Sequence, residues 1–253
     1  MEIKLISSYD EMSKLAAKMV AKKIKDKPNT VLGLATGSTP EGMYRELVKM
    51  YKEDELDLSQ VVTFNLDEYL GLSPDHPQSY HYYMYENFFN HVNIKEENIY
   101  IPKGDTKDPV RECLNYEKEI EKVEGIDLQI LGIGINGHVG FNEPDINLEA
   151  ETHIIQLSDD TITANSRFFR NLDEVPKRAI TMGMKTIMKS KKIILMAWGL
   201  EKKEAVLKAI SRHINTEIPA SLLQLHNDII LIVDKKIYSS STVTDPLSYP
   251  DKI

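Results

Sequence analysis

The stretch LGIGINGHVGFNEP, from Leu131 to Pro144, is the most informative part of the sequence for both fold and function. An apolar run from residue 126 to residue 133 leads into it, with glycines near the end of the run. This pattern predicts a buried strand that continues into a glycine-rich turn. The turn then places four polar side chains within a few positions of one another: Asn136, His138, Asn142 and Glu143.

These polar residues have two interpretations. An imidazole, a carboxylate and two amides at the carboxyl end of a strand suit a site of acid–base chemistry. Histidine, asparagine and glycine are also common in turns, so a purely structural polar loop fits the same letters. His138 has no second histidine at metal-ligand spacing, which argues against a metal site.

A second candidate loop follows the short apolar strand VLGLA at 31–35. The next letters, TGSTP, predict a helix start with Thr39 as its N-cap and Pro40 at its first position. Backbone N–H groups and the positive end of the helix dipole make such a turn a suitable phosphate site. Alternatively, Gly37 and the neighbouring hydroxyl groups only shape and cap the turn.

Two further strands end in charged residues. VVTFNL at 61–66 is followed by Asp67 and Glu68, and ligands commonly bind at such positions in open α/β sheets. A solvated strand end is the alternative. KKIILMAW at 191–198 precedes a predicted helix with Lys202 in its first turn, where a cation opposes the helix dipole. A bound anion would explain that placement, although an exposed lysine there is common.

The whole chain predicts an α/β fold with an open, mostly parallel sheet and helices on both faces. Ser8 and Glu11 open a first helix as a capping box, and further strands and helices alternate as far as the strand at 228–234. Neither repeats nor linker-like segments interrupt this alternation, so residues 1–253 form a single domain with a polar tail at 235–253. Loops that follow parallel strands meet at one edge, which would bring the candidate residues together.

Composition limits the possible partners. The chain has 253 residues, of which 42% are hydrophobic and 28% charged, and its net charge is −8. No general attraction to nucleic acid or to anionic membranes is expected. The single cysteine, Cys113, excludes an intramolecular disulfide, and neither a signal peptide nor an apolar span is evident. We therefore expect a soluble, cytoplasmic protein, and the missing dinucleotide and Walker fingerprints disfavour nucleotide cofactors.

Several segments together closely resemble the glucosamine-6-phosphate deaminase family: LGLATGSTP, VTFNLDEYLGL, GIGINGHVGFNEP, TANSRFF and SLLQLH. The resemblance extends from about Val31 to Val233 in the same order and spacing. NLDEY and GHVGFNEP are specific, whereas the glycine loop is shared with wider sugar-phosphate relatives such as 6-phosphogluconolactonases. The resemblance implies a Rossmann-like fold and conversion of glucosamine 6-phosphate and water to fructose 6-phosphate and ammonia, without a metal or organic cofactor.

The resemblance also implies roles for individual residues. Asp67 matches the base that moves a proton between C2 and C1, and His138 matches the residue that opens the sugar ring. Glu143 and Asn136 match the pair that orients and tunes the histidine. The residues that match the phosphate-binding positions are Thr36, Gly37, Ser38, Thr39, Arg167 and Lys202.

Two positions depart from the family pattern. Some members have aspartate where this chain has Asn136, so Glu143 is expected to carry more of the charge stabilisation of the histidine. Hexameric members bind N-acetylglucosamine 6-phosphate through basic residues after FNEP, but His153 and Ile155 stand where those residues are expected. We therefore predict no activation by the acetylated sugar.

Other functions stay open on the sequence. A lactonase or another sugar-phosphate isomerase would use the same fold, and a sugar-phosphate sensor would bind without turnover. The complete NLDEY and GHVGFNEP motifs favour the deaminase, and the acidic net charge disfavours a regulator that binds DNA. A monomer or small homo-oligomer is expected.

Overall fold

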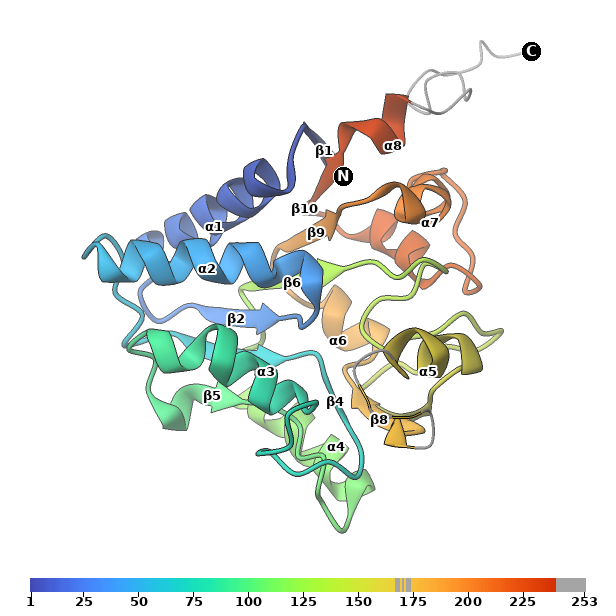
Figure 1. Ribbon diagram of the computed structural model, residues 1–253, viewed down its shortest axis with the longest axis horizontal. Coiled ribbons are helices and arrows are strands. Elements are labelled where there is room, and N and C mark those ends of the chain that lie inside the picture. Colours follow the sequence, from blue (N-terminus) through green and yellow to red (C-terminus); the bar gives the residue numbers. More distant parts are fainter. Residues whose placement is uncertain (167–168, 170, 172–173, 240–253) are drawn as a thin grey trace.

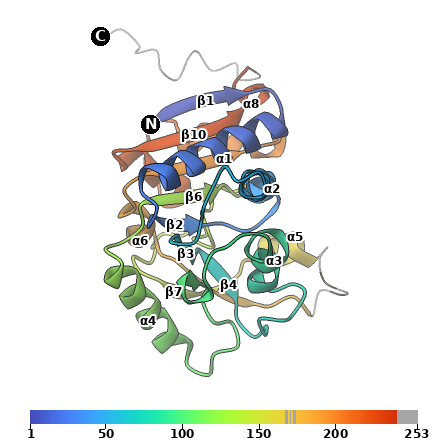
Figure 2. The same ribbon diagram turned by 90° about the vertical axis from the view of Figure 1, so that its left-hand side faces the viewer.

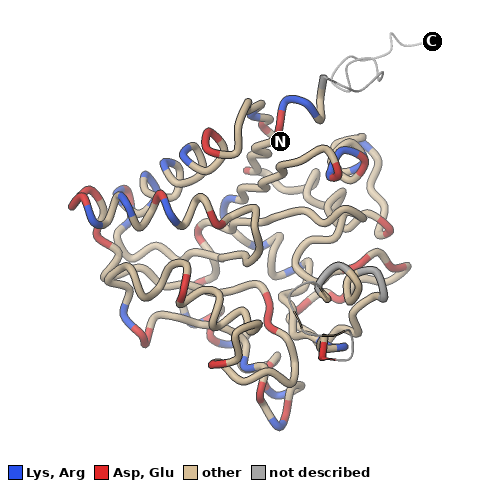
Figure 3. The backbone as a smooth tube through the Cα atoms, in the orientation of Figure 1, with Lys and Arg blue, Asp and Glu red and all other residues tan. Residues whose placement is uncertain are grey.

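The computed structural model describes residues 1–166, 169, 171 and 174–239. Arg167, one of the expected phosphate ligands, and most of the polar tail lie outside these residues. The first five residues of that tail form helix α8 (Lys235–Ser239). Within the described part of the chain, no helix is long and apolar enough to cross a membrane. Figure 3 shows acidic and basic residues interspersed along the first two helices.

A seven-stranded sheet forms the centre of the molecule, and every pair of neighbouring strands in it is parallel. Figure 2 shows the strands descending from β1 at the top, through β10, β6 and β2, to β3. The prediction of an open, mostly parallel sheet is confirmed. The strands in spatial order are β1 (Glu2–Ile6), β10 (Ile229–Asp234), β9 (Ile193–Ala197), β6 (Leu128–Gly132), β2 (Val31–Leu34), β3 (Val62–Asn65) and β5 (Ile99–Tyr100).

Helices cover both faces of this sheet because its strands are apolar on both sides. In β9, Ile194 and Met196 belong to one core cluster, whereas Ile193 and Leu195 belong to the other. The first cluster includes residues of α1 (Tyr9–Asp26), α2 (Ser38–Lys52) and α3 (Tyr80–Asn87). The second includes residues of α4 (Pro109–Lys122), α6 (Met184–Met188), α7 (Lys203–Ala209) and α8.

A small antiparallel sheet, which the sequence did not predict, lies beside the main one. Its strands are β4 (Asp67–Tyr69), β8 (Arg178–Thr181) and β7 (His153–Gln156), in that spatial order. Asp67 and Glu68 are therefore part of a buried strand, and the alternative of a solvated strand end is wrong. The remaining elements are α5 (Asp159–Ser166) and short 3-10 turns at Phe89–His91, Glu96–Asn98, Leu200–Lys202 and Pro219–Leu225.

The order of the strands predicts where a ligand would bind. From β2 the chain continues to β3 and β5 on one side, whereas β6 leads to β9 and β10 on the other. The sheet therefore has a topological switch point between β2 and β6, where open α/β sheets place their ligands. In Figure 1 the arrowheads of both strands point toward α5. The loops that follow β2 and β6 contain most of the predicted site residues.

Candidate active site

Glycines shape the loop after β6 so that the side chain of His138 folds back over the backbone. The N–H of Gly134 donates to the carbonyl of His138 at 2.9 Å, and Gly137 takes a left-handed φ of 90°. An ideal Cβ at Gly134 would lie 2.3 Å from the imidazole Cε1, so a side chain there would collide with the ring. Glycine at these positions therefore fixes the direction of the imidazole.

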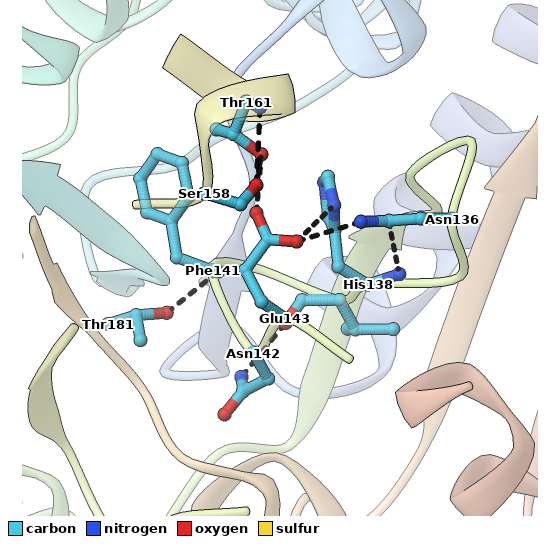
Figure 4. Close-up of polar contacts among 9 residues, drawn as sticks. Asn136, His138, Phe141, Asn142, Glu143, Ser158, Thr161 and Thr181 are labelled. Atoms are coloured by element: carbon cyan, nitrogen blue, oxygen red, sulfur yellow. Dashed lines mark hydrogen bonds and ion pairs between the residues drawn. The ribbon is translucent and has the colours of Figure 1, made fainter. Parts of the chain in front are cut away.

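Glu143 is the centre of a buried polar group that contains His138. Figure 4 shows its carboxylate between Asn136 and His138 of the loop after β6 and Thr161 of α5. Asn136 Nδ2 donates to one carboxylate oxygen at 2.8 Å, and the hydroxyl of Thr161 donates to the other at 2.5 Å. His138 Nδ1 lies 3.6 Å from the first oxygen. Burial alone would raise the pKa of Glu143, but the contacts with His138, Thr161 and Asn136 outweigh it and lower the pKa to about 2.

Asn136 bonds the side chain of Glu143 and the backbone of His138, but its hydrogen bonds do not involve the imidazole ring. Its Oδ1 accepts from the backbone N–H of His138 at 3.2 Å, and its Nδ2 donates to Glu143. Within the described residues, the buried Nδ1 atom of His138 has no hydrogen-bond partner, and at 3.6 Å its contact with Glu143 is an ion-pair distance. Glu143 therefore provides the charge near the imidazole, and Asn136 holds the loop and the carboxylate in place.

Asp67 lies on the buried strand β4, with 6% of its surface exposed. Burial and then the neighbouring charge of Glu68 raise its pKa to about 8. Glu68 is also buried, and burial raises its pKa to about 7 although three backbone N–H groups bond its carboxylate. Two of those N–H groups belong to the first turn of α3, at Tyr80 and His81. A carboxyl group with a pKa near 8 is a stronger base than an ordinary aspartate.

The loop after β6 and strand β4 meet at Gly140 and Thr181. An ideal Cβ at Gly140 would lie 3.0 Å from Thr181 Oγ1 and 3.5 Å from Asp67 Oδ2, so the loop passes close to both side chains, and the left-handed φ of 59° favours glycine. The hydroxyl of Thr181 also accepts from the N–H of Phe141 at 3.0 Å. Because Thr181 pairs with Asp67 between β8 and β4, the small sheet ties the loop of His138 to the strand of Asp67.

The expected phosphate loop after β2 has the open backbone that an anion requires. Helix α2 begins at Ser38 with Gly37 as its N-cap, so the prediction of Thr39 as the N-cap is wrong. A φ of 100° at Gly37 allows the chain to enter the helix earlier than the hydroxyl pattern indicated. Gly37 and Ser38 are exposed, and Thr36 and Thr39 are partly exposed.

Lys202 also lies slightly before its predicted position in the first turn of a helix. It lies in the 3-10 turn Leu200–Lys202 that follows β9, directly before α7, and is half-buried. Since β9 neighbours β6 in the sheet, this turn belongs to the same carboxyl edge as the loops of His138 and Thr36. The described residues thus place every predicted site residue except Arg167 on loops or strands at that edge.

Sequence reasoning missed Thr161 and Thr181 as parts of the site, and it named Glu68 beside Asp67 without assigning it a role. The letters DEY contained a signal for Glu68, because a second acid directly follows the proposed base. Thr161 precedes the TANSRFF segment and carried no separate signal. Among the described residues, no group of three or more histidine, cysteine, aspartate or glutamate side chains could hold a metal ion.

Comparisons with known proteins agree on one family. Residues 7–231 match the family model described as glucosamine-6-phosphate isomerases/6-phosphogluconolactonase. A glucosamine-6-phosphate deaminase of Thermoanaerobacter sp. (strain X514) is 59% identical over 239 residues, which cover 94% of each chain. A protein of the same name from Clostridium acetobutylicum is 57% identical over 235 residues, covering 93% of this chain and 98% of its own.

Two solved structures have a similar fold, one at higher and one at lower sequence identity. A glucosamine-6-phosphate deaminase described as monomeric superposes with a TM-score of 0.92 at 44% identity, covering 95% of this chain and 100% of its own. A 6-phosphogluconolactonase of Thermotoga maritima gives a TM-score of 0.70 at 21% identity, covering 92% and 99%. The second likeness shows a shared fold alone.

Proposed function

Because the chain belongs to the family of glucosamine-6-phosphate isomerases and 6-phosphogluconolactonases, we propose that it converts glucosamine 6-phosphate and water to fructose 6-phosphate and ammonia. The observation that carries this proposal is Asp67, a buried carboxyl group whose pKa is raised to about 8 and which adjoins the loop of His138. A base of this kind suits the removal of a proton from carbon. The names of the relatives at 57% and 59% identity agree with this reaction.

Ring opening is the first step of the proposed reaction, and His138 performs it. The imidazole takes the proton of the anomeric hydroxyl and gives a proton to the ring oxygen, so that the C1–O5 bond breaks and an aldehyde forms. A histidine suits this shuttle because its ordinary pKa lies near neutrality. Glu143 stays ionised at neutral pH, since its pKa is about 2, and stabilises the imidazolium that forms transiently.

Asp67 performs the second step. Once C1 is an aldehyde, the C2 proton becomes acidic, and the carboxylate removes it while the C1 oxygen takes a proton from the ammonium group at C2, which leaves an enolamine. The same carboxyl group then returns the proton to C1, and the resulting imine at C2 reacts with water to give the ketone and ammonia. A carboxyl group with a pKa near 8 both accepts and returns a proton readily at neutral pH.

The phosphate group is held at the loop after β2. The donors are the N–H and hydroxyl groups of residues 36–39, and Lys202 adds a positive charge from the turn after β9. Arg167, expected to contribute a bidentate contact, lies outside the described residues. Local donors of this kind are needed to bind a dianion in a chain of net charge −8.

A lactonase is the alternative enzyme on this fold, and the buried carboxyl group of Asp67 argues against it. Hydrolysis of a lactone moves no proton from carbon, so a desolvated base on β4 would have no task. For the same reason a sensor that binds without turnover has no use for a carboxyl group held at a raised pKa. We further infer that the protein is a monomer or small homo-oligomer in the cytoplasm, in keeping with the monomeric description of the similar deaminase structure.

The proposal is tested by measuring fructose 6-phosphate and ammonia released from glucosamine 6-phosphate, without added metal. The wild type should give both products in equal amounts, and Asp67→Asn should lose about 100-fold or more in kcat, a typical contribution of general base catalysis. Asp75→Asn, an exposed aspartate in the following loop, is the matched control and should keep full activity. No ammonia from folded wild type would refute the deaminase, and an active Asp67→Asn would remove the proposed base.

A further inference from the structure

Three tyrosine hydroxyls donate hydrogen bonds to the backbone carbonyls of the loop after β2. Tyr44 donates to the carbonyl of Ala35 at 2.6 Å, and Tyr83 donates to that of Gly37 at 2.7 Å. Tyr9 donates to the carbonyl of Ser38 at 2.6 Å. The three rings come from different helices, α2, α3 and α1, so the loop is held from several sides.

Fixing these carbonyls also fixes the N–H groups that follow them. In a planar trans peptide, the C=O of one residue and the N–H of the next point in opposite directions. The N–H groups of Thr36, Ser38 and Thr39 are therefore turned away from the tyrosine hydroxyls. An ideal Cβ at Gly37 would meet nothing within 4 Å, so the loop is open at its centre.

The hydroxyl of Tyr9 bonds the first turn of α2. The N–H of Gly42 donates to the Tyr9 hydroxyl at 2.8 Å, and that hydroxyl donates to the carbonyl of Ser38. The Tyr9 hydroxyl thus bonds a donor and an acceptor of the first turn that are four residues apart. An ideal Cβ at Gly42 would lie 2.9 Å from the Tyr9 ring and 2.2 Å from Ser13 Oγ, so glycine makes the close approach of Tyr9 possible.

The ring of Tyr9 also contacts Trp198, which lies between β9 and the turn that contains Lys202. It packs edge-to-face against Trp198 with ring centroids 6.2 Å apart, and Trp198 directly follows β9 and precedes that turn. One side chain of α1 therefore contacts the loop after β2 and the residue that directly follows β9.

Tyr83 connects the loop to the strand of the proposed base. Its helix, α3, begins with two N–H groups that donate to Glu68 on β4, at 2.9 and 2.8 Å. Burial raises the pKa of the Tyr83 hydroxyl, so it stays protonated and remains a donor at neutral pH. The loop and the strand of Asp67 are thus joined through one short helix.

We propose that Tyr9 and Tyr83 are positioning residues that hold the loop at 35–39 in the conformation that binds a phosphate monoester dianion. This inference rests on the proposed phosphate site and adds the residues that keep its donors in place. Neither hydroxyl touches the substrate. Their loss should therefore weaken the binding of the phosphate group and leave the proton transfers at C1 and C2 unchanged.

Tyr9→Phe and Tyr83→Phe test this inference because each removes one oxygen atom and keeps the ring. Both side chains are only half-buried, whereas Tyr44 is fully buried and is left unchanged. Each variant should raise the KM for glucosamine 6-phosphate and the Kd for inorganic phosphate about two- to tenfold, the range for one hydrogen bond. The kcat at saturation and the pH profile of kcat should stay as in the wild type.

Tyr85→Phe is the matched control. Tyr85 lies on the same helix as Tyr83, but its hydroxyl donates to Glu96 at 2.5 Å, whereas that of Tyr83 donates to the loop at Gly37. This variant should keep the wild-type phosphate affinity. Unchanged affinity in Tyr9→Phe and Tyr83→Phe, an equal loss in Tyr85→Phe, or a fall in kcat at constant KM would overturn the inference. If wild type binds inorganic phosphate but releases no ammonia, the deaminase proposal fails while the phosphate measurements still test the two tyrosines.

Discussion

Replacing Asp67 by asparagine should make the folded protein more stable, and the gain should grow as the pH rises. The pKa of Asp67 is raised from 3.8 to about 8 by burial and by the charge of Glu68. Between these two values the unfolded chain has lost the proton, whereas the folded protein keeps it. A raised carboxyl pKa therefore lowers the free energy of unfolding as the pH rises through this window.

The size of the effect follows from the pKa difference. About four pKa units correspond to roughly 5 kcal/mol, lost progressively between about pH 4 and pH 8. The amide of Asp67→Asn would reduce this gain in the free energy of unfolding by about 1–3 kcal/mol if its buried polar atoms find no partners. The variant should thus be no more stable than wild type at pH 4, and more stable by about 2–4 kcal/mol at pH 8.

Urea unfolding at pH 4, 5, 6, 7 and 8 measures this difference directly, with kcat recorded for the same preparations. Asp75→Asn is again the control, because its exposed side chain should give a stability curve parallel to that of the wild type. Parallel curves for wild type and Asp67→Asn would refute the reasoning, since the carboxyl group would then have the same pKa in the folded and unfolded chain. A stabilised variant without activity would show that the carboxyl group of Asp67 is needed for catalysis although it lowers the free energy of unfolding.

Three further predictions concern other parts of the molecule. Glu143→Gln should lower kcat and change the pH–rate profile, because an amide cannot stabilise an imidazolium by charge; an unchanged rate and profile would contradict this role. Asp127 accepts hydrogen bonds from Lys27, Lys191 and the N–H of Val31 at the opposite edge of the sheet. Asp127→Asn should therefore lower the free energy of unfolding by about 1–3 kcal/mol and leave kcat unchanged. N-acetylglucosamine 6-phosphate should not activate the enzyme, because His153 and Ile155 stand where basic residues are expected to bind the acetylated sugar; a sigmoidal substrate curve that becomes hyperbolic with this sugar would show otherwise.

The main sheet could be predicted because its central strands are short apolar runs between glycine or polar turns. The interior strands β2, β6, β9 and β10 are all of this kind, and both of their faces are buried. The strands that were missed lie at edges or in the small sheet. β4 has only three residues, two of them acidic, and its pairing with β8 joins residues more than a hundred positions apart. Local patterns contain no information on such a pairing.

The candidate site shows the same division between local and distant information. His138, Glu143 and Asn136 lie within eight residues, so their grouping could be predicted from the letters alone. The hydroxyl of Thr161 that bonds Glu143, and Thr181 that joins the loop to β4, come from segments that only the folded chain brings close. The start of α2 was misplaced because the φ of Gly37, and not a hydroxyl cap, begins the helix.

Two carboxyl groups of the site have opposite pKa shifts, and this difference supports their separate roles. Both are buried, but Glu143 receives hydrogen bonds from Asn136 and Thr161 and lies beside His138, so its pKa falls to about 2. For Asp67 the two causes, burial and the charge of Glu68, both raise the pKa, to about 8. A pair of groups whose environments separate their pKa values in this way divides acid–base work between them. At neutral pH the low pKa keeps Glu143 negatively charged beside the imidazole, whereas the raised pKa lets Asp67 exchange its proton, and the proposed ring opening and enolisation require this combination.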